Sequence, residues 1–264
     1  MTHPFVDAYT WQSEAPGRWR GGFSPAWFQG RGAYGGLVAA VLLRGMTEVV
    51  GDPLRAVRTL TVHFCAPAVE GESTLHAVRV RGGFTVSHAA ARIVQGAQTV
   101  ALASATFAAG RNDATSYFDL APPSLPPPEG IAPVPEGVGM PVFTDFFEFR
   151  FAPEALPFAS SEVAHLAGYI RPRAPLGFDP LLAVGLIDAF PPAAFARLAR
   201  PRGAASVDFR VQFFDRSDAP DDAAYALDLR SRWARDGLTD ETATLWSPSG
   251  RLLARCDQLI ALLG

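Results

Sequence analysis

The sequence repeats one order of predicted elements, and this repeat most limits the folds that the chain can adopt. An apolar segment at residues 33–50 is followed by four strand-like stretches joined by short turns. A second apolar segment, at residues 181–190, is again followed by four such stretches. Consecutive strands joined by short turns pair as antiparallel neighbours, so a βαβ arrangement is excluded. The pattern therefore predicts two α+β units, each with a long central helix lying on one face of an antiparallel sheet.

Both apolar segments carry the end signals of buried helices. The first segment, residues 33–50, has Gly35 and Gly36 near its start and is followed by Gly51, which is typical of a helix end. Asp179 can cap a second helix whose first turn contains Pro180. We expect that second helix to span residues 180–197 and to match the first in a pseudo-twofold arrangement. The predicted strands cover residues 57–65, 73–81, 85–95 and 99–107, and then 204–214, 223–235, 241–246 and 252–262.

A proline-rich stretch separates the two halves. Eight prolines fall between positions 122 and 141, and such a segment can be neither a helix interior nor a central strand. It is typical of an extended connection over the surface. We therefore expect an N-terminal unit at residues 1–115, a linker at residues 116–142 and a C-terminal unit at residues 143–264.

Charge and hydropathy exclude several classes of function. The net charge of −3 and the scattered basic residues give no footprint for nucleic acid. No apolar stretch is long enough to span a bilayer and the N-terminus lacks a secretion signal, so we expect a cytoplasmic protein that does not bind membranes. Cys65 and Cys256 lack the spacing of metal ligands, and no metal or cofactor is expected.

Two polar side chains fall where apolar residues are expected. Asp188 lies within the second apolar segment, and alternation along the last strand places Gln258 on the same face as Cys256. An unpaired buried charge costs several kcal/mol in practice, so the pair can share a hydrogen bond or a water molecule in a site. The alternatives are that Asp188 lies at the helix end and reaches solvent, and that Gln258 is a core amide satisfied by the backbone.

The chain resembles the double-hotdog acyl-CoA thioesterases of the thioesterase II type over nearly its whole length. The motifs that carry the resemblance are Ser24-Pro25-Ala26-Trp27, Gly35-Gly36, Phe64-Cys65-Ala66-Pro67, and Gly168-Tyr169-Ile170-Arg171 ahead of Asp179-Pro180-Leu181. The resemblance implies two tandem hotdog units and a hydrolytic water held by Asp188, Ser206 and Gln258. Ser206 departs from the family pattern, because the family usually has Thr there; the hydroxyl is kept.

The resemblance also implies that a site lies between two units, where the start of one helix faces the acidic residue of the other. Gly35 and Gly36 would then face Asp188, and the helix N-terminus would stabilise the oxyanion of a thioester under attack. A purely structural alternative is that the two glycines only allow tight packing. Overlaying the halves puts Arg44 opposite Asp188 and Thr106 opposite Gln258, so one site per chain is expected.

The sequence thus predicts an acyl-CoA thioester hydrolase with acyl-CoA as its substrate and a role in fatty acid metabolism. We also expect association into a homo-oligomer, because exposed edge strands favour it. One alternative is a non-catalytic hotdog protein that binds acyl-CoA or lipid, and the change to Ser206 keeps this alternative open. Strict alternation places Ser206 on the outer face with Asp208, unless it lies at the strand edge, where alternation fails; the alternative is an ordinary turn serine. A hydratase is disfavoured because the chain lacks the Asp-x-x-x-x-His arrangement of hotdog hydratases.

Overall fold

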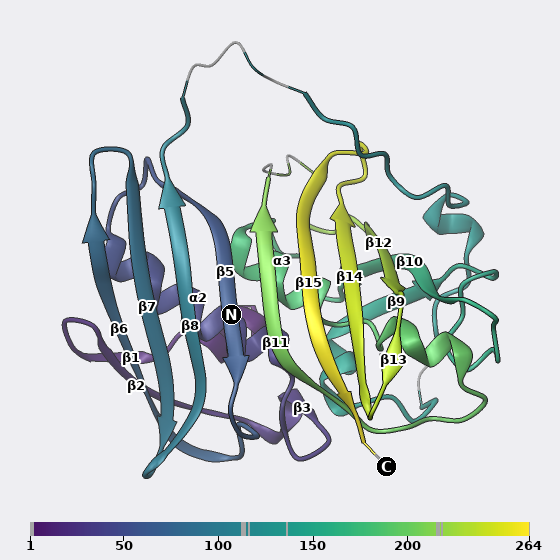
Figure 1. The fold of residues 1–264 in the computed structure, drawn as a ribbon, viewed down its shortest axis with the longest axis horizontal. Helices are drawn as coiled ribbons and strands as arrows, with labels where there is room; N and C mark the ends of the chain where they lie inside the picture. The colour runs from purple at the N-terminus through teal and green to yellow at the C-terminus, as the bar shows by residue number, and fades with distance from the viewer. Residues whose placement is uncertain are drawn as a thin grey trace.

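One antiparallel sheet runs across both halves of the chain (Figure 1). The computed structural model describes residues 3–111, 115, 117–135, 137–214, 217 and 219–263, and in these the sheet has thirteen strands. From the first edge the order is β1 (Gln12–Ala15), β2 (Arg18–Phe23), β6 (Gly71–Gly82), β7 (Val86–Gln95), β8 (Gln98–Ala108) and β5 (Ala56–Phe64). It continues with β11 (Ala204–Phe213), β15 (Leu252–Leu262), β14 (Leu238–Trp246), β12 (Tyr225–Ser231), β10 (Ala164–Pro172) and β9 (Phe147–Phe151), while β13 (Ala234–Arg235) pairs with β14.

The strand order has a pseudo-twofold axis at the ladder between β5 and β11. Thr61 lies opposite Arg210 at the centre of that ladder. Each of the two central strands has one bulge near its own N-terminal end, between Val57 and Thr59 in β5 and between Ser206 and Asp208 in β11. The two halves are therefore matched strand for strand, and the predicted α+β class with a pseudo-twofold repeat is confirmed.

The two principal helices lie on one face of the sheet and pack against each other (Figure 1). Helix α2 (Gly35–Val50) is buried over most of its length and ends at Gly51, which adopts the left-handed conformation with φ of 61°. Helix α3 (Pro180–Ile187) begins at Asp179, whose side chain accepts a hydrogen bond from the Leu182 N–H at 2.7 Å. One core of buried apolar side chains joins both helices and both halves of the sheet.

The second helix is shorter than the predicted span of residues 180–197. It ends at Ile187, and a 3-10 turn, η4 (Ala193–Arg197), follows after Pro191 and Pro192. Proline lacks the N–H that a helix interior requires and collides with the preceding turn, so the apolar pattern continues where the helix cannot. The early end matters for function because it places Asp188 at the C-terminus of α3.

The remaining elements are short. A helix α1 (Pro4–Tyr9), a 3-10 turn η1 (Pro25–Trp27) and the strand pair β3 (Phe28–Gln29) and β4 (Gly32–Ala33) precede α2, and η2 (Pro128–Gly130) and η3 (Val142–Phe146) lie in the connection between the halves. The expected boundaries at residues 115 and 142 stay a prediction, because the sheet and the core cross from one half to the other. None of the helices in the described residues has the length and apolarity needed to cross a membrane.

Candidate active site

Asp188 lies at the junction of the two helices. Its backbone forms the C-terminal cap of α3, and its carboxylate accepts a hydrogen bond from the Gly36 N–H at the start of α2. A Cβ atom added to Gly35 would lie 2.8 Å from Asp188 Oδ2, and one added to Gly36 would lie 2.9 Å from the Val184 carbonyl oxygen. The glycines thus permit both the close approach of the carboxylate and the tight packing of α2 on α3.

The environment of Asp188 favours its protonated form. Burial of the carboxyl group raises its pKa from 3.8 to about 7, the Gly36 hydrogen bond opposes this rise, and the charge of Glu241 adds to it. The residue as a whole keeps some solvent-accessible surface although protein atoms surround its carboxyl group. A carboxylate with a pKa near neutrality is a stronger base than an ordinary aspartate and is still partly ionised at pH 7.

Ser206 and Gln258 meet on the inner face of the sheet. The Ser206 hydroxyl donates to Gln258 Oε1 at 3.0 Å. Strict alternation would have turned Ser206 outward, but the bulge between Ser206 and Asp208 shifts the register and leaves Val207 exposed instead. The bulge therefore explains how a serine in an apparently outward position reaches an inward glutamine.

Glu241 is a site residue that the sequence reasoning missed. It lies on β14 directly opposite Gln258, is only 2% exposed, and its Oε1 accepts from Gln258 Nε2 at 2.7 Å. Its other oxygen accepts from the Ala193 N–H at 2.5 Å. Alternation with the buried Thr239 and Ala243 was a signal that could have found it, because it places a carboxylate on the apolar face of a strand.

The same physical causes act on the Glu241 carboxyl group. Burial raises its pKa from 4.5 to about 7, the hydrogen bonds from Ala193 and Gln258 oppose the rise, and Asp240 adds to it. Asp188 and Glu241 are thus two buried carboxyl groups within electrostatic range of each other. The Cys256 thiol lies near both, and burial together with these charges raises its pKa well above the usual value.

The first half has apolar residues where the second half has the polar cluster. The ladders and the matching bulges pair Val57 with Ser206, Ala105 with Gln258 and Ala89 with Glu241. The predicted pairing of Thr106 with Gln258 is wrong by one residue: Thr106 faces outward and its hydroxyl contacts His88 Nδ1 at 3.2 Å. A one-residue error moves a side chain to the other face of a strand.

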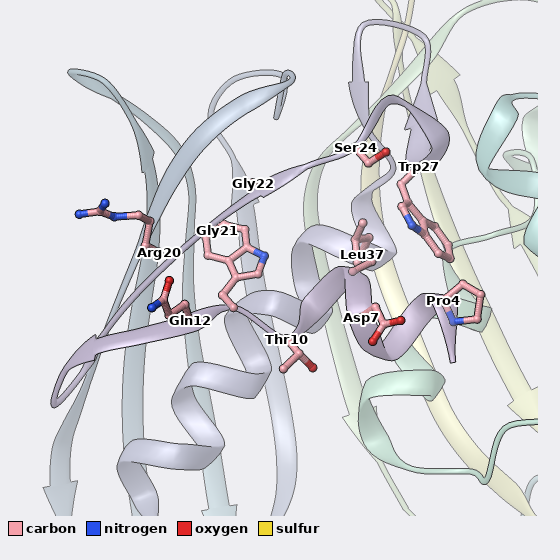
Figure 2. A pocket seen from close by; sticks show the side chains of 12 residues that line it. Pro4, Asp7, Thr10, Gln12, Arg20, Gly21, Gly22, Ser24, Trp27 and Leu37 are labelled. Atoms are coloured by element: carbon pink, nitrogen blue, oxygen red, sulfur yellow. The ribbon is translucent and has the colours of Figure 1, made fainter. Parts of the chain in front are cut away.

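A groove of about 390 Å³ lies near this region, between the α1 segment and β2 (Figure 2). Trp27 and Leu37 lie toward one end of the groove and Arg20 and Gln12 toward the other. The polar cluster of Asp188, Ser206, Glu241 and Gln258 is not part of its lining. In the part of the chain that the structure describes, three or more His, Cys, Asp or Glu residues are nowhere grouped so as to hold a metal ion.

Comparison with known proteins places this chain in a family. A model of the acyl-CoA thioesterase N-terminal domain matches residues 23–108, and a model of the acyl-CoA thioesterase C-terminal domain matches residues 121–262. The chain belongs to the acyl-CoA thioesterase family. No protein with curated annotation matches the sequence significantly.

Solved structures show the same fold as this acyl-CoA thioesterase family member along its full length. A hot dog fold protein of unknown function from Alicyclobacillus acidocaldarius is 24% identical, with a TM-score of 0.89 over 100% of this chain and 99% of that one. A putative thioesterase II from Thermobifida fusca is 21% identical with a TM-score of 0.85, covering 98% of this chain and 97% of that one. An acyl-CoA thioesterase II from Mycobacterium marinum is 21% identical with a TM-score of 0.75 over the same shares of the two chains.

The predicted family and the hotdog fold are thereby confirmed. At these identities the structural likeness concerns the fold alone, so it assigns no role to an individual side chain. Catalytic or binding roles stay a prediction for Asp188, Gln258, Ser206, Gly35 and Gly36.

Proposed function

We propose that this protein hydrolyses an acyl-CoA thioester to a free carboxylic acid and CoA, with Asp188 as the general base. The observation that carries the proposal is the Asp188 carboxyl group itself, which is enclosed by protein, has a pKa of about 7, and meets the start of a helix from the other half of the chain. A base poised near neutral pH and beside backbone donors suits acyl transfer to water.

The proposed reaction has two steps. Asp188 takes a proton from a water molecule as the water oxygen bonds to the thioester carbonyl carbon, whose oxygen becomes an oxyanion. The oxyanion lies at the start of α2, where it is proposed to accept from the Gly35 N–H, to share the Gly36 N–H with Asp188, and to be stabilised by the helix dipole. The intermediate then collapses, the C–S bond breaks, and the CoA thiolate takes the proton from Asp188.

Ser206 and Gln258 are proposed to position the water. Their hydrogen bond at 3.0 Å fixes both side chains on the inner face of the sheet, in the cluster that includes the carboxylate of Glu241. No part of the step needs a metal ion or a cofactor. We further propose a cytoplasmic homo-oligomer that acts in fatty acid metabolism, with the edge strands β1 and β9 available for association.

A panel of acyl-CoA thioesters tests the proposal. The purified protein is assayed with short, medium, long and aromatic acyl-CoAs, and CoA release is followed with a thiol reagent. We expect turnover of at least one class together with release of the matching free acid. Cys65 is exposed and reacts with the same reagent, so a blank without substrate is subtracted.

The outcome of the panel also decides between hydrolysis and binding alone. A non-hydrolysable acyl-CoA analogue, in which CH₂ replaces the thioester sulfur, is titrated against the same protein by calorimetry. If the analogue binds and no thioester of the panel is cleaved, the protein is a binding protein and the proposed function is wrong.

A further inference from the structure

Glu241 is linked to Ser206 by hydrogen bonds through the side chain of Gln258. Its Oε1 accepts from Gln258 Nε2 at 2.7 Å, and Gln258 Oε1 accepts from the Ser206 hydroxyl at 3.0 Å. Its Oε2 accepts from the Ala193 N–H at 2.5 Å, at the start of η4. The four groups therefore form one continuous hydrogen-bonded chain from the backbone of η4 to Ser206.

When Glu241 is ionised, its carboxylate sets the direction of every hydrogen bond in this chain. An ionised carboxylate has no proton to donate, so Gln258 must turn its NH₂ group toward Glu241. Its carbonyl oxygen then faces Ser206, and because this oxygen carries no proton either, the serine hydroxyl must donate. Ser206 consequently has only lone pairs left for any other partner in the site.

We propose that Glu241 is a positioning residue that fixes this direction, so that Ser206 offers the attacking water an acceptor and not a donor. The inference rests on the proposed function, in which Ser206 contacts that water. An acceptor at Ser206 binds a proton of the water and leaves the oxygen lone pair free for the thioester carbon. A donor at Ser206 would occupy that lone pair and weaken the nucleophile.

The backbone donor makes the direction reversible by a single substitution. The Ala193 N–H is part of the main chain and can only donate. In Glu241→Gln the new carbonyl oxygen must face Ala193, so the new NH₂ group faces Gln258. Gln258 then turns over to present its own oxygen, its NH₂ group faces Ser206, and the serine proton is released toward the site. The variant keeps the volume of the side chain and reverses the chain of hydrogen bonds.

Protonation of Glu241 should reverse the hydrogen bonds in the same way as the Glu241→Gln substitution. Its carboxyl group is faced by Asp188 from the end of α3 and by Cys256 from β15, with Asp240 adjacent on its own strand. The partners from η4 and β11 are the Ala193 N–H and the Ser206 hydroxyl, neither of which titrates near neutral pH. Acidification through neutrality should therefore turn Gln258 over in the parent protein.

Kinetics test whether Glu241 acts through Gln258. We expect Glu241→Gln to lower kcat by up to about 10²-fold, as a misplaced group does, with KM nearly unchanged. Combining it with Gln258→Ala should slow the enzyme no further than Gln258→Ala alone. Thr239→Val is the matched control, because Thr239 lies two residues away on the same buried face and bonds to Ser231 and Trp233 instead. Losses that multiply in the double variant would overturn the proposal.

Side-chain NMR gives a reading that does not depend on hydrolysis. The Gln258 NH₂ signals of glutamine-labelled protein are assigned by their absence in Gln258→Ala. In the parent they should shift on acidification with the midpoint of a ¹³C-labelled glutamate carboxyl signal that is absent from Glu241→Gln, and in Glu241→Gln they should not shift with that midpoint. If the Gln258 NH₂ signals of the parent do not shift with the titration of that glutamate, the inference is overturned even if hydrolysis is intact. If the parent hydrolyses no thioester but the signals shift, the proposed function fails while the orientation by Glu241 stands.

Discussion

The starts of the two principal helices are treated in opposite ways. At α3 the chain caps itself, because the Asp179 side chain accepts from the Leu182 N–H and Pro180 occupies the first turn. At α2 the preceding residue, Tyr34, makes no side-chain cap, and the Gly36 N–H instead binds the Asp188 carboxylate of the other half. Only a helix start that lacks its own cap can offer its donors to a group from elsewhere, so the chemistry is expected at α2 alone.

The groups facing the two helix starts differ in charge as well. Asp188 faces α2, whereas Arg44 lies near the start of α3, where burial raises the pKa of Asp179 and the hydrogen bond from the Leu182 N–H and the charge of Arg44 oppose the rise. Arg44 also forms an ion pair with Glu48 at 2.5 Å. On the sheet of the first half, the positions that match the polar cluster hold the buried apolar residues Val57, Ala105 and Ala89. Of the two pseudo-symmetric positions on the sheet, the one in the second half therefore carries polar side chains and the one in the first half carries apolar side chains.

The largest effect should come from Asp188→Asn. The shape and the hydrogen bond from Gly36 are kept while the proton acceptor is lost, and a positioned base contributes about 10²–10⁴-fold to such a step. We expect hydrolysis of the best acyl-CoA to fall by about that factor, with thermal melts showing an intact fold. The matched change at the other junction, Arg44→Gln, should leave turnover close to that of the parent. Equal activity in Asp188→Asn and the parent would contradict the assignment of the base.

Gly35→Ala tests the close approach at the α2 start. The new Cβ would lie 2.8 Å from Asp188 Oδ2 and 3.0 Å from Phe64 Cζ, so the carboxylate must move. We expect kcat to fall by up to about 10²-fold, although alanine favours a helix by about 1 kcal/mol over glycine. The control is Gly110→Ala, since an added Cβ there meets nothing within 4 Å. Unchanged kcat in Gly35→Ala would show that the carboxylate is not held where the proposed mechanism needs it.

The buried carboxyl groups should make stability depend on pH. Both have folded pKa values of about 7 against ordinary values of 3.8 and 4.5, so the folded state binds more protons than the unfolded state between these limits. Their contribution is fully present below about pH 4 and is lost as the pH rises through 7. At pH 8, Asp188→Asn should therefore melt at a higher temperature than the parent, with a free energy of unfolding larger by an amount on the order of a few kcal/mol. At pH 4 the two proteins should differ little. If the difference in melting temperature between the two proteins is the same at pH 4 and at pH 8, the raised pKa of Asp188 is contradicted.

The smallest effect is expected from Asp179→Ala at the self-capped helix. Loss of a side-chain cap typically costs about 1 kcal/mol of stability, and the proposed reaction does not use Asp179. Urea unfolding should show that loss, while kcat/KM with the best acyl-CoA stays near the parent value. A strong loss of kcat with normal stability would show that the α3 junction is functional and would break the comparison.

Much of the candidate site could be predicted from residue patterns, and the failures have physical causes. Alternation along β15 placed Gln258 inside, and the apolar helix made Asp188 stand out. The extent of α3 was wrong because Pro191 and Pro192 stop a helix within a segment that stays apolar. Glu241 was missed because the strand containing it was predicted to begin at that residue, which hid its alternation with Thr239.

The sequence by itself determined the two apolar helices, the antiparallel strands between short turns, and the capping of α3 by Asp179, because these follow from local periodicity and from neighbouring residues. Only the tertiary structure decided which groups meet. The bulge at Ser206 depends on pairing with β15, the hydrogen bond from Gly36 to Asp188 joins residues far apart in the chain, and Glu241 receives its second donor from η4. The raised pKa values follow from burial of these carboxyl groups in the folded core, and no stretch of sequence carries that information alone.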